Sequence, residues 1–177
     1  VRRGLAFASN ADEQDDRSLT ERAGRITSEF AGQLPAIRAL LFTDLEAAYQ
    51  GDPAATSTSE VLLCYPGMHA VIYYRIAHAL HRLEAPLIPR LISEIAHSST
   101  GIDIHPAAEI GSHFFIDHGT GVVIGETSVI GKRVRLYQAV TLGAKRFTEG
   151  EHGDLIKGEP RHPILEDDVV IYAGATI

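Results

Sequence analysis

The stretch GIDIHPAAEIGSHFFIDHGTGVVIGETSVIGKRVRLYQAVTLGAK, residues 101–145, decides the fold. Aliphatic residues recur in it at every sixth position, and small or polar residues often follow them. The first phase comprises Ile104, Ile110, Ile116 and Val122, and the second, slipped by two positions, comprises Ile124, Ile130, Leu136 and Leu142. A hexapeptide period is typical of a parallel β-helix, in which three short strands form one triangular coil of ~18 residues with stacked inward aliphatic side chains.

The slip between the two phases falls directly after the sequence DHGTG, residues 117–121. A break in a regular repeat is where a solenoid usually departs from pure scaffolding, although a loop irregularity would give the same pattern. A third aliphatic phase comprises Leu165, Ile171 and Ile177. The polar, Gly-rich segment 144–163 that precedes it is too long for a coil corner, so we expect a loop that leaves one edge of the β-helix and has a functional role.

Before residue 100 the pattern is helical. Ser18–Glu21 (SLTE) and Ser57–Glu60 (STSE) have the form of capping boxes, Pro35 can open a helix that Gly51 closes, and Pro86 and Pro89 can start a short helix. An apolar stripe with a spacing of four predicts an amphipathic helix that carries Met68, Ile72, Ile76 and Leu80.

These patterns predict an α+β chain, with an N-terminal helical extension over residues 1–34, ordered only in part, an α-helical domain over 35–100 and a β-helix over 101–177 with its loop at 144–163. Because Ile177 is itself a hexad position, we expect the β-helix to be truncated at its C-terminal end here.

The composition excludes several classes of protein. The 177 residues carry a formal net charge of −7 without a long Lys/Arg run, which argues against a dedicated nucleic-acid-binding role. Cys64 is the one cysteine, so the chain has no internal disulfide and no multi-cysteine metal site. Neither a run of eighteen apolar residues nor a secretory h-region is present, and we therefore expect a cytoplasmic protein without membrane contact.

The sequence resembles the serine O-acetyltransferases over roughly residues 35–177. The resemblance lies in DIHP (103–106), DHGTGVVIGE (117–126) and RHP (161–163), behind a helical region with DPA (52–54) and YPGMHAVIYYRIAHAL (65–80). It implies an α-helical N-terminal domain and a left-handed parallel β-helix. It also implies a homotrimer or a dimer of trimers, with active sites between neighbouring β-helices.

The family reaction transfers acetyl from the co-substrate acetyl-CoA to the hydroxyl of L-serine, on the way to cysteine, with no tightly bound cofactor. A neutral alcohol is a poor nucleophile and needs a base, and an imidazole titrates near neutrality. The resemblance gives this role to His118, with Asp103 as the carboxylate that orients the ring. The spacing of fifteen residues between them, in a coil of ~18, could bring them together across adjacent sides.

A zwitterionic acceptor needs acidic groups for its ammonium and basic groups for its carboxylate. The resemblance assigns Asp52 and Asp117 to the ammonium, and Arg161 and His162 to the carboxylate and hydroxyl end. Ala144 and Ala173 are assigned to the acetyl-CoA groove, although the sequence around both departs from the commonest family pattern. Lys145 or Arg146 could meet a CoA phosphate or could simply be solvated.

The other histidines favour structural readings: a cap for His105, and solvent-facing positions for His113 and His152. We expect no metal site. Hexapeptide-repeat carbonic anhydrases bind a metal through three His ligands across a subunit interface, and His105, His113 and His118 could suggest the same arrangement. The rival functions are an O-acyltransferase for a sugar or another hydroxylated acceptor, and a non-catalytic scaffold. In the family, a tail C-terminal to this region takes part in feedback inhibition by cysteine and docks into O-acetylserine sulfhydrylase, so that partner is expected only with a tail beyond Ile177.

Overall fold

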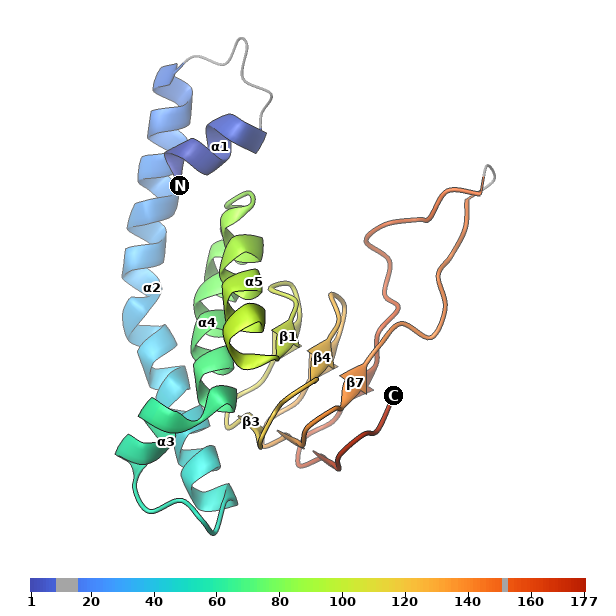
Figure 1. Ribbon diagram of the computed structural model, residues 1–177. Coiled ribbons are helices and arrows are strands. Elements are labelled where there is room, and N and C mark those ends of the chain that lie inside the picture. The colour runs from blue at the N-terminus through green and yellow to red at the C-terminus, as the bar shows by residue number, and fades with distance from the viewer. Residues whose placement is uncertain (9–15, 151–152) are drawn as a thin grey trace.

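The structure is a computed structural model that describes residues 1–8, 16–150 and 153–177. Five helices come first, and short strands wound into coils follow (Figure 1). The helices are α1 (Arg2–Ala8), α2 (Asp16–Gly51), α3 (Thr58–Cys64), α4 (Pro66–Arg82) and α5 (Ile88–Thr100). The strands are β1 (Asp103–Ile104), β2 (Glu109–Ile110), β3 (Phe115–Ile116), β4 (Val123–Ile124), β5 (Val129–Ile130), β6 (Arg135–Leu136), β7 (Thr141–Leu142), β8 (Ile164–Leu165) and β9 (Val170–Ile171).

Helix α2 corrects two expectations about helix starts. It runs without interruption from Asp16 to Gly51, so that Ser18 lies inside the helix rather than at its N-cap, and Pro35 does not open a new helix. Proline removes one backbone hydrogen bond inside a helix. Pro35 and Ala31, whose carbonyl would have accepted that bond, are both exposed, so water can replace the missing donor.

Other helix signals are confirmed. The Ser57 side chain accepts a hydrogen bond from the Glu60 N–H at 3.1 Å and caps α3, and α2 ends at Gly51 as expected. Helix α4 carries the predicted stripe, but its buried residues extend well beyond that stripe because it lies between α2, α5 and the first coil. On α5, Leu91 and Ile95 are exposed.

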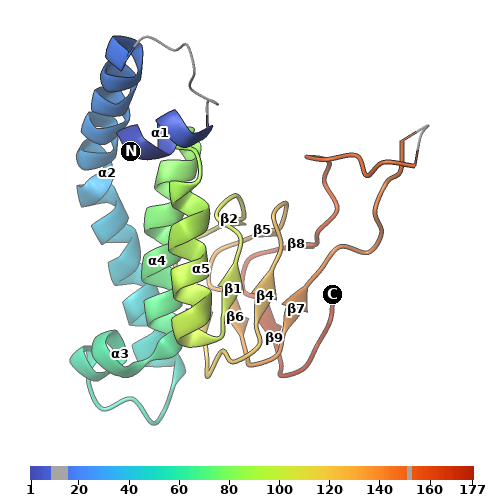
Figure 2. The same cartoon turned by 45° about the horizontal axis from the view of Figure 1, so that its top comes forward.

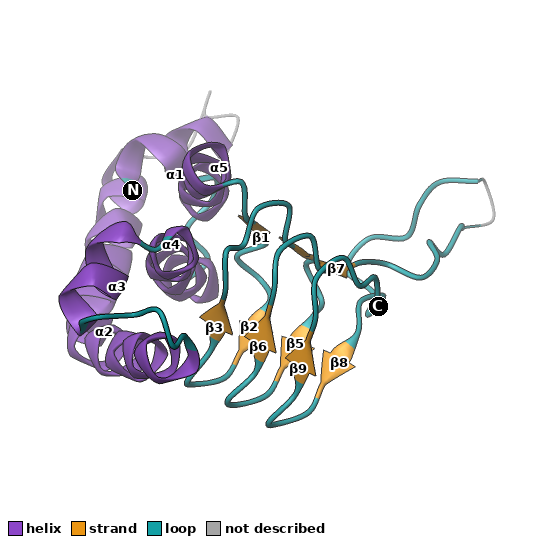
Figure 3. Cartoon of the chain, turned by 60° about the horizontal axis from the view of Figure 1, so that its bottom comes forward, coloured by secondary structure: helices purple, strands orange, loops and turns teal. Residues whose placement is uncertain are grey.

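The strands form the three faces of a triangular prism (Figures 2 and 3). Each face is a parallel sheet with one strand from each coil: β1-β4-β7, β2-β5-β8 and β3-β6-β9. The predicted hexad aliphatics fill the interior, where Ile116, Ile124, Leu136 and Leu142 are at most 1% exposed. Stacked inward residues therefore form the core that the six-residue period predicted.

The two-residue slip in the repeat is an enlarged corner. Ile124 follows Ile116 by eight positions, whereas Leu142 follows Leu136 by six, and both pairs join the same two faces. The additional residues lie in the turn 117–121, where Gly119 and Gly121 have positive φ. The first coil thus has a wider corner at DHGTG than the second coil has at the equivalent place.

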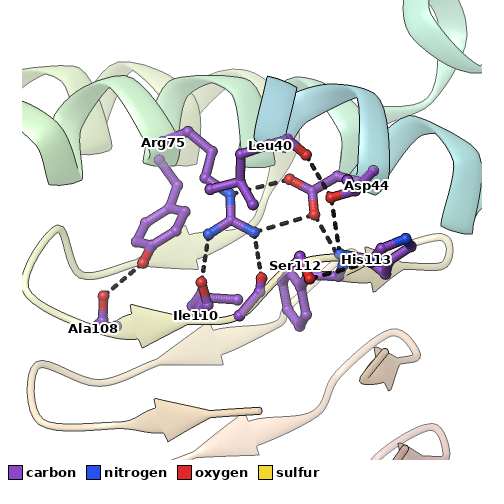
Figure 4. Close-up of polar contacts among 11 residues, drawn as sticks. Leu40, Asp44, Arg75, Ala108, Ile110, Ser112 and His113 are labelled. Carbon is purple, nitrogen blue, oxygen red and sulfur yellow. Dashed lines mark hydrogen bonds and ion pairs between the residues drawn. The ribbon is translucent and has the colours of Figure 1, made fainter. Parts of the chain in front are cut away.

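The helices cover the first coil through buried polar contacts (Figure 4). Arg75 of α4 is ion-paired with Asp44 of α2, with 3.0 Å between Nε and Oδ2, and its guanidinium donates to the carbonyls of Ile110 and Gly111 at 2.6 Å each. Asp44 Oδ1 also accepts from the N–H of Phe114 at 2.9 Å. Two helices and the first coil are thereby tied together at one buried ion pair.

A long loop leaves the β-helix between β7 and β8 and projects away from the coils (Figures 1 and 3). In its described part, Glu149 and Leu155 form an antiparallel bridge, and Phe147 and Leu155 are more than half exposed. Among the described residues, no helix combines the length and the apolar character that a membrane crossing needs.

Candidate active site at two edges of the beta-helix

The DHGTG corner presents the imidazole of His118 to solvent. The His118 side chain is 70% exposed, while that of Asp117 is 14% exposed, and 3.8 Å separate His118 Nδ1 from Asp117 Oδ1. His118 has a φ of 59°. Positive φ also occurs at His113, Arg133 and Asp168. Those residues occupy the corner between the second and third strands of successive coils, which is a different corner from that of His118, so positive φ recurs at corners of this β-helix and is not in itself a mark of catalysis.

Asp103 lies beside the same corner. The Gly121 N–H donates to the Gly101 carbonyl at 2.8 Å, and the Asp103 N–H donates to the Val122 carbonyl at 2.9 Å. Gly119 has a φ of 89°, a backbone conformation that other residues rarely adopt, which explains the glycine. Within the described chain no hydrogen bond joins the Asp103 carboxylate to the His118 ring, and the orienting role of Asp103 stays a prediction.

Asp52 reaches this corner from the helical layer. It directly follows α2, and its Oδ2 accepts from the Tyr65 hydroxyl at 2.5 Å while Oδ1 accepts from the Ala54 N–H at 2.8 Å. The Tyr65 hydrogen bond is the main cause that lowers the pKa of Asp52, and the charges of His118 and Arg135 act in the same direction. Asp52, Asp117 and His118 therefore lie near one another at one edge of the prism, and the binding and catalytic roles assigned to them stay a prediction.

Arg161 and His162 form a second group with the corner that follows β4. The Arg161 guanidinium is ion-paired with Glu126. His162 Nδ1 accepts from the Thr127 N–H at 3.1 Å, and Thr127 Oγ1 accepts from the Arg161 N–H at 2.9 Å. A methyl group on Gly125 would lie 2.0 Å from the His162 ring, so the ring packs directly on the backbone at that glycine.

This second group borders an open pocket of about 460 Å³. Its lining includes Glu126, Thr127, Pro160 and His162. Burial and the neighbouring Arg161 lower the pKa of His162, which favours a neutral ring. The Arg161 side chain lowers the pKa of Glu126, so the pocket lining combines a carboxylate that favours its charged form with an imidazole that favours its neutral form.

The two groups lie at opposite edges of the β1-β4-β7 face, because the DHGTG corner precedes β4 and the Glu126 corner follows it. The predicted acetyl-CoA residues divide in the same way. Sheet register places Ala173 two coils below His118, and it places Ala144 directly below Glu126. Each edge thus carries part of the predicted acceptor site and part of the predicted acetyl-CoA groove.

Two further histidines of the β-helix make structural contacts. His105 Nδ1 accepts from the Ala107 N–H at 3.1 Å and caps the turn after β1, which agrees with the structural reading. His113 is half-buried rather than solvent-facing, because α2 covers it and Thr43 accepts its N–H at 3.1 Å. His152 lies outside the described residues. In the described ranges, no three His, Cys, Asp or Glu side chains are close enough to hold a metal ion.

Comparison with known proteins identifies the family. The sequence model "Serine acetyltransferase, N-terminal" matches residues 5–72. A plasmid-encoded serine acetyltransferase of Synechococcus elongatus is 62% identical over 159 residues, which is 90% of this chain and 50% of the relative. The serine acetyltransferase of Helicobacter pylori is 50% identical over 133 residues, which is 75% of this chain and 72% of the relative. This chain belongs to the serine acetyltransferase family.

Solved structures of serine acetyltransferases share this fold. Serine acetyltransferase 1 of Entamoeba histolytica, in complex with L-cysteine, gives a TM-score of 0.84 at 46% identity over 98% of this chain and 62% of that one. The soybean enzyme complexed with serine gives a TM-score of 0.73 at 36% identity, over 91% of this chain and 61% of that one. A serine acetyltransferase complexed with CoA gives 0.73 at 35% identity, over the same shares.

These likenesses confirm the predicted fold class: an α-helical N-terminal part followed by the left-handed parallel β-helix of the serine acetyltransferases. The chain spans about half the length of the first of these curated relatives.

Sequence reasoning missed three polar partners in the two groups. Tyr65 stands in the YPGMH stretch that resembles the family, and its position next to a helix-opening proline was a usable signal. Glu126 and Thr127 directly follow an inward aliphatic and its glycine, where a coil turns. Polar residues at a corner are ordinary in a solenoid, so the sequence alone gave little reason to select these two.

Proposed function

We propose that this chain carries the catalytic region of a serine O-acetyltransferase, which moves acetyl from acetyl-CoA to the hydroxyl of L-serine and releases O-acetyl-L-serine and CoA. The observation that carries the proposal is the exposed His118 imidazole 3.8 Å from the Asp117 carboxylate, with Asp52 near enough for the charge of His118 to lower its pKa. Two carboxylates suit the ammonium group of an amino acid, whereas a sugar acceptor has no charge for them to bind.

In the proposed reaction His118 is the general base. It takes the proton of the serine hydroxyl while that oxygen forms its bond to the thioester carbonyl carbon. The carbon–sulfur bond then breaks, and the CoA thiolate takes the proton from the imidazolium. Asp103, the neighbouring carboxylate on β1, would hold the ring and stabilise its charged form. Binding both substrates side by side removes much of the entropic cost of their encounter.

The carboxylate of serine would meet Arg161 and His162, and acetyl-CoA would lie along Ala144 and Ala173. Since these residues lie at two different edges of the prism, we propose that each site forms between two neighbouring chains, one edge from each. The homotrimer, or a dimer of trimers, supplies this arrangement. The cytoplasmic location stays a prediction.

A thiol-release assay tests the function. The protein is mixed with acetyl-CoA and with L-serine, a sugar or glycerol, and free CoA is followed with a thiol reagent. Release that depends on L-serine is the expected result. Release that prefers the sugar would favour the broader acyltransferase reading, and no release with any acceptor would leave only a scaffold.

A further inference from the structure

The backbone of Tyr65 is fixed from both sides. Tyr65 ends α3, where its N–H donates to the Val61 carbonyl at 3.2 Å, and it is also the N-cap of α4, where its carbonyl accepts from the His69 N–H at 3.1 Å. Pro66 fixes the next φ angle at the start of α4. A residue shared by two helices has little freedom to move its side chain through backbone motion.

The Tyr65 ring is held as well. It packs against the apolar cluster around Ala48, Val61, Met68 and Phe115, between the end of α2 and β3. Its hydroxyl therefore arrives at Asp52 from a fixed direction, 2.5 Å from Oδ2. An ionised carboxylate has roughly four acceptor positions on its two oxygens. Tyr65 and the Ala54 N–H use one on each oxygen, so both oxygens retain capacity for a cation.

Tyr65 is also tied to the DHGTG corner through the backbone. Gly67, at the start of α4, approaches β3 so closely that a methyl group there would lie 2.1 Å from the Ile116 carbonyl oxygen. Ile116 directly precedes Asp117 and His118. Only Pro66 separates Gly67 from Tyr65, so the phenol is placed relative to the corner by rigid helix and strand, not by a loop.

We propose that Tyr65 is a positioning residue of the acceptor site, whose phenol aims the Asp52 carboxylate at the Asp117–His118 corner to receive the α-ammonium of the amino-acid acceptor. This inference rests on the proposed function. It adds Tyr65 to the acceptor site, and its separate evidence is the Tyr65–Asp52 hydrogen bond. A tyrosine also suits the task chemically, because its donor lies at the end of a rigid ring.

The charged groups around Asp52 set the direction of a pH effect. Tyr65, His118 and Arg135 lower the pKa of Asp52, with the Tyr65 hydrogen bond as the largest cause. Asp117 and Glu60 also face Tyr65. The hydrogen bond to Asp52 is the main cause that raises the pKa of Tyr65 to about 12, so the phenol keeps its proton. Loss of the hydroxyl should therefore raise the pKa of Asp52, and Asp52 should then lose its charge at a higher pH.

The test compares Tyr65→Phe with Tyr73→Phe, a matched change on the partly exposed side of α4. For Tyr65→Phe we expect KM for L-serine to rise by about tenfold, the size of one hydrogen bond to a charged group, with kcat and KM for acetyl-CoA within about twofold of wild type. The acid limb of the pH profile of kcat/KM for L-serine should move to higher pH. Tyr73→Phe should change none of these quantities.

A Tyr65→Phe enzyme with wild-type KM for L-serine and an unmoved acid limb would overturn the inference. If the wild-type chain itself releases no thiol with L-serine, the proposed function fails instead. In that case the pKa of the Asp52 carboxyl is measured by carbon-13 NMR in wild type and in Tyr65→Phe, which tests the positioning role without an activity assay. An unchanged pKa would reject that role.

Discussion

His118 combines exposure with a neighbouring acid, and this combination suits a base that must reach a substrate. Replacement by alanine leaves no side chain at that corner that can take a proton near neutral pH. We expect His118→Ala to reduce kcat for serine-dependent thiol release by about 10²- to 10⁴-fold, the usual contribution of general acid–base catalysis. His97→Ala, which removes an exposed histidine on α5, should retain the full rate.

His105 illustrates how a histidine can be structural within the same motif. Its Nδ1 accepts the Ala107 N–H, so the cap requires a neutral ring. Burial is the largest cause that lowers its pKa, to about 4, from 6.5. Between these two pH values the unfolded chain binds more protons than the folded chain, and stability should therefore fall as the pH falls from about 6.5 to 4.

Denaturant unfolding of wild type and His105→Gln across that range measures the effect. The Gln side-chain oxygen can still accept a hydrogen bond but does not titrate, so the loss of unfolding free energy on acidification should be smaller in the variant. Parallel pH dependences for the two proteins would show that His105 does not titrate in this way.

At the scale of elements, the buried pair Arg75–Asp44 joins α2 and α4 to the first coil. Burial raises the pKa of Asp44, and Arg75 and the Phe114 N–H oppose this. Asp44→Asn would leave the Arg75 charge buried without a counter-charge. We expect a loss of about 3–5 kcal/mol in the free energy of unfolding, measured with denaturant.

Asp168→Asn is the matched control, because it removes one carboxylate from the exposed pair with Arg133. Exposed ion pairs contribute little to stability, so its unfolding midpoint should stay close to that of wild type. Equal midpoints for all three proteins would mean that the Arg75–Asp44 pair does not hold the helices to the coil.

The sequence predicted elements well where the signal was periodic or local. Six-residue spacing identified the strands, and Ser57 and Gly51 marked real helix ends. Pro35 misled because its exposed place in α2 tolerates a lost hydrogen bond, a fact of tertiary position. Tyr65 and Asp52 are thirteen residues apart in the sequence and are brought together by helix packing. No periodicity indicates such a contact.

At the scale of the whole molecule, the predicted site residues fall into two groups, at two edges of one face. Sequence motifs indicated these residues but carried no information on the edge of the β-helix that each one would occupy. That division depends on coil length, on the enlarged DHGTG corner and on where the long loop rejoins the coil at β8. It is also the feature that makes a single chain insufficient for the proposed site.

Subunit mixing tests this division. His118→Ala and Arg161→Ala should each be nearly inactive alone, since every site of the proposed homotrimer would then lack one group. Co-refolded in equal amounts, they should form mixed trimers in which His118 of one chain meets Arg161 of its neighbour. With random assembly about a quarter of the sites are then complete, so about a quarter of the wild-type thiol release should return. If both groups had to come from one chain, mixing would restore nothing, because every chain would still lack one of them.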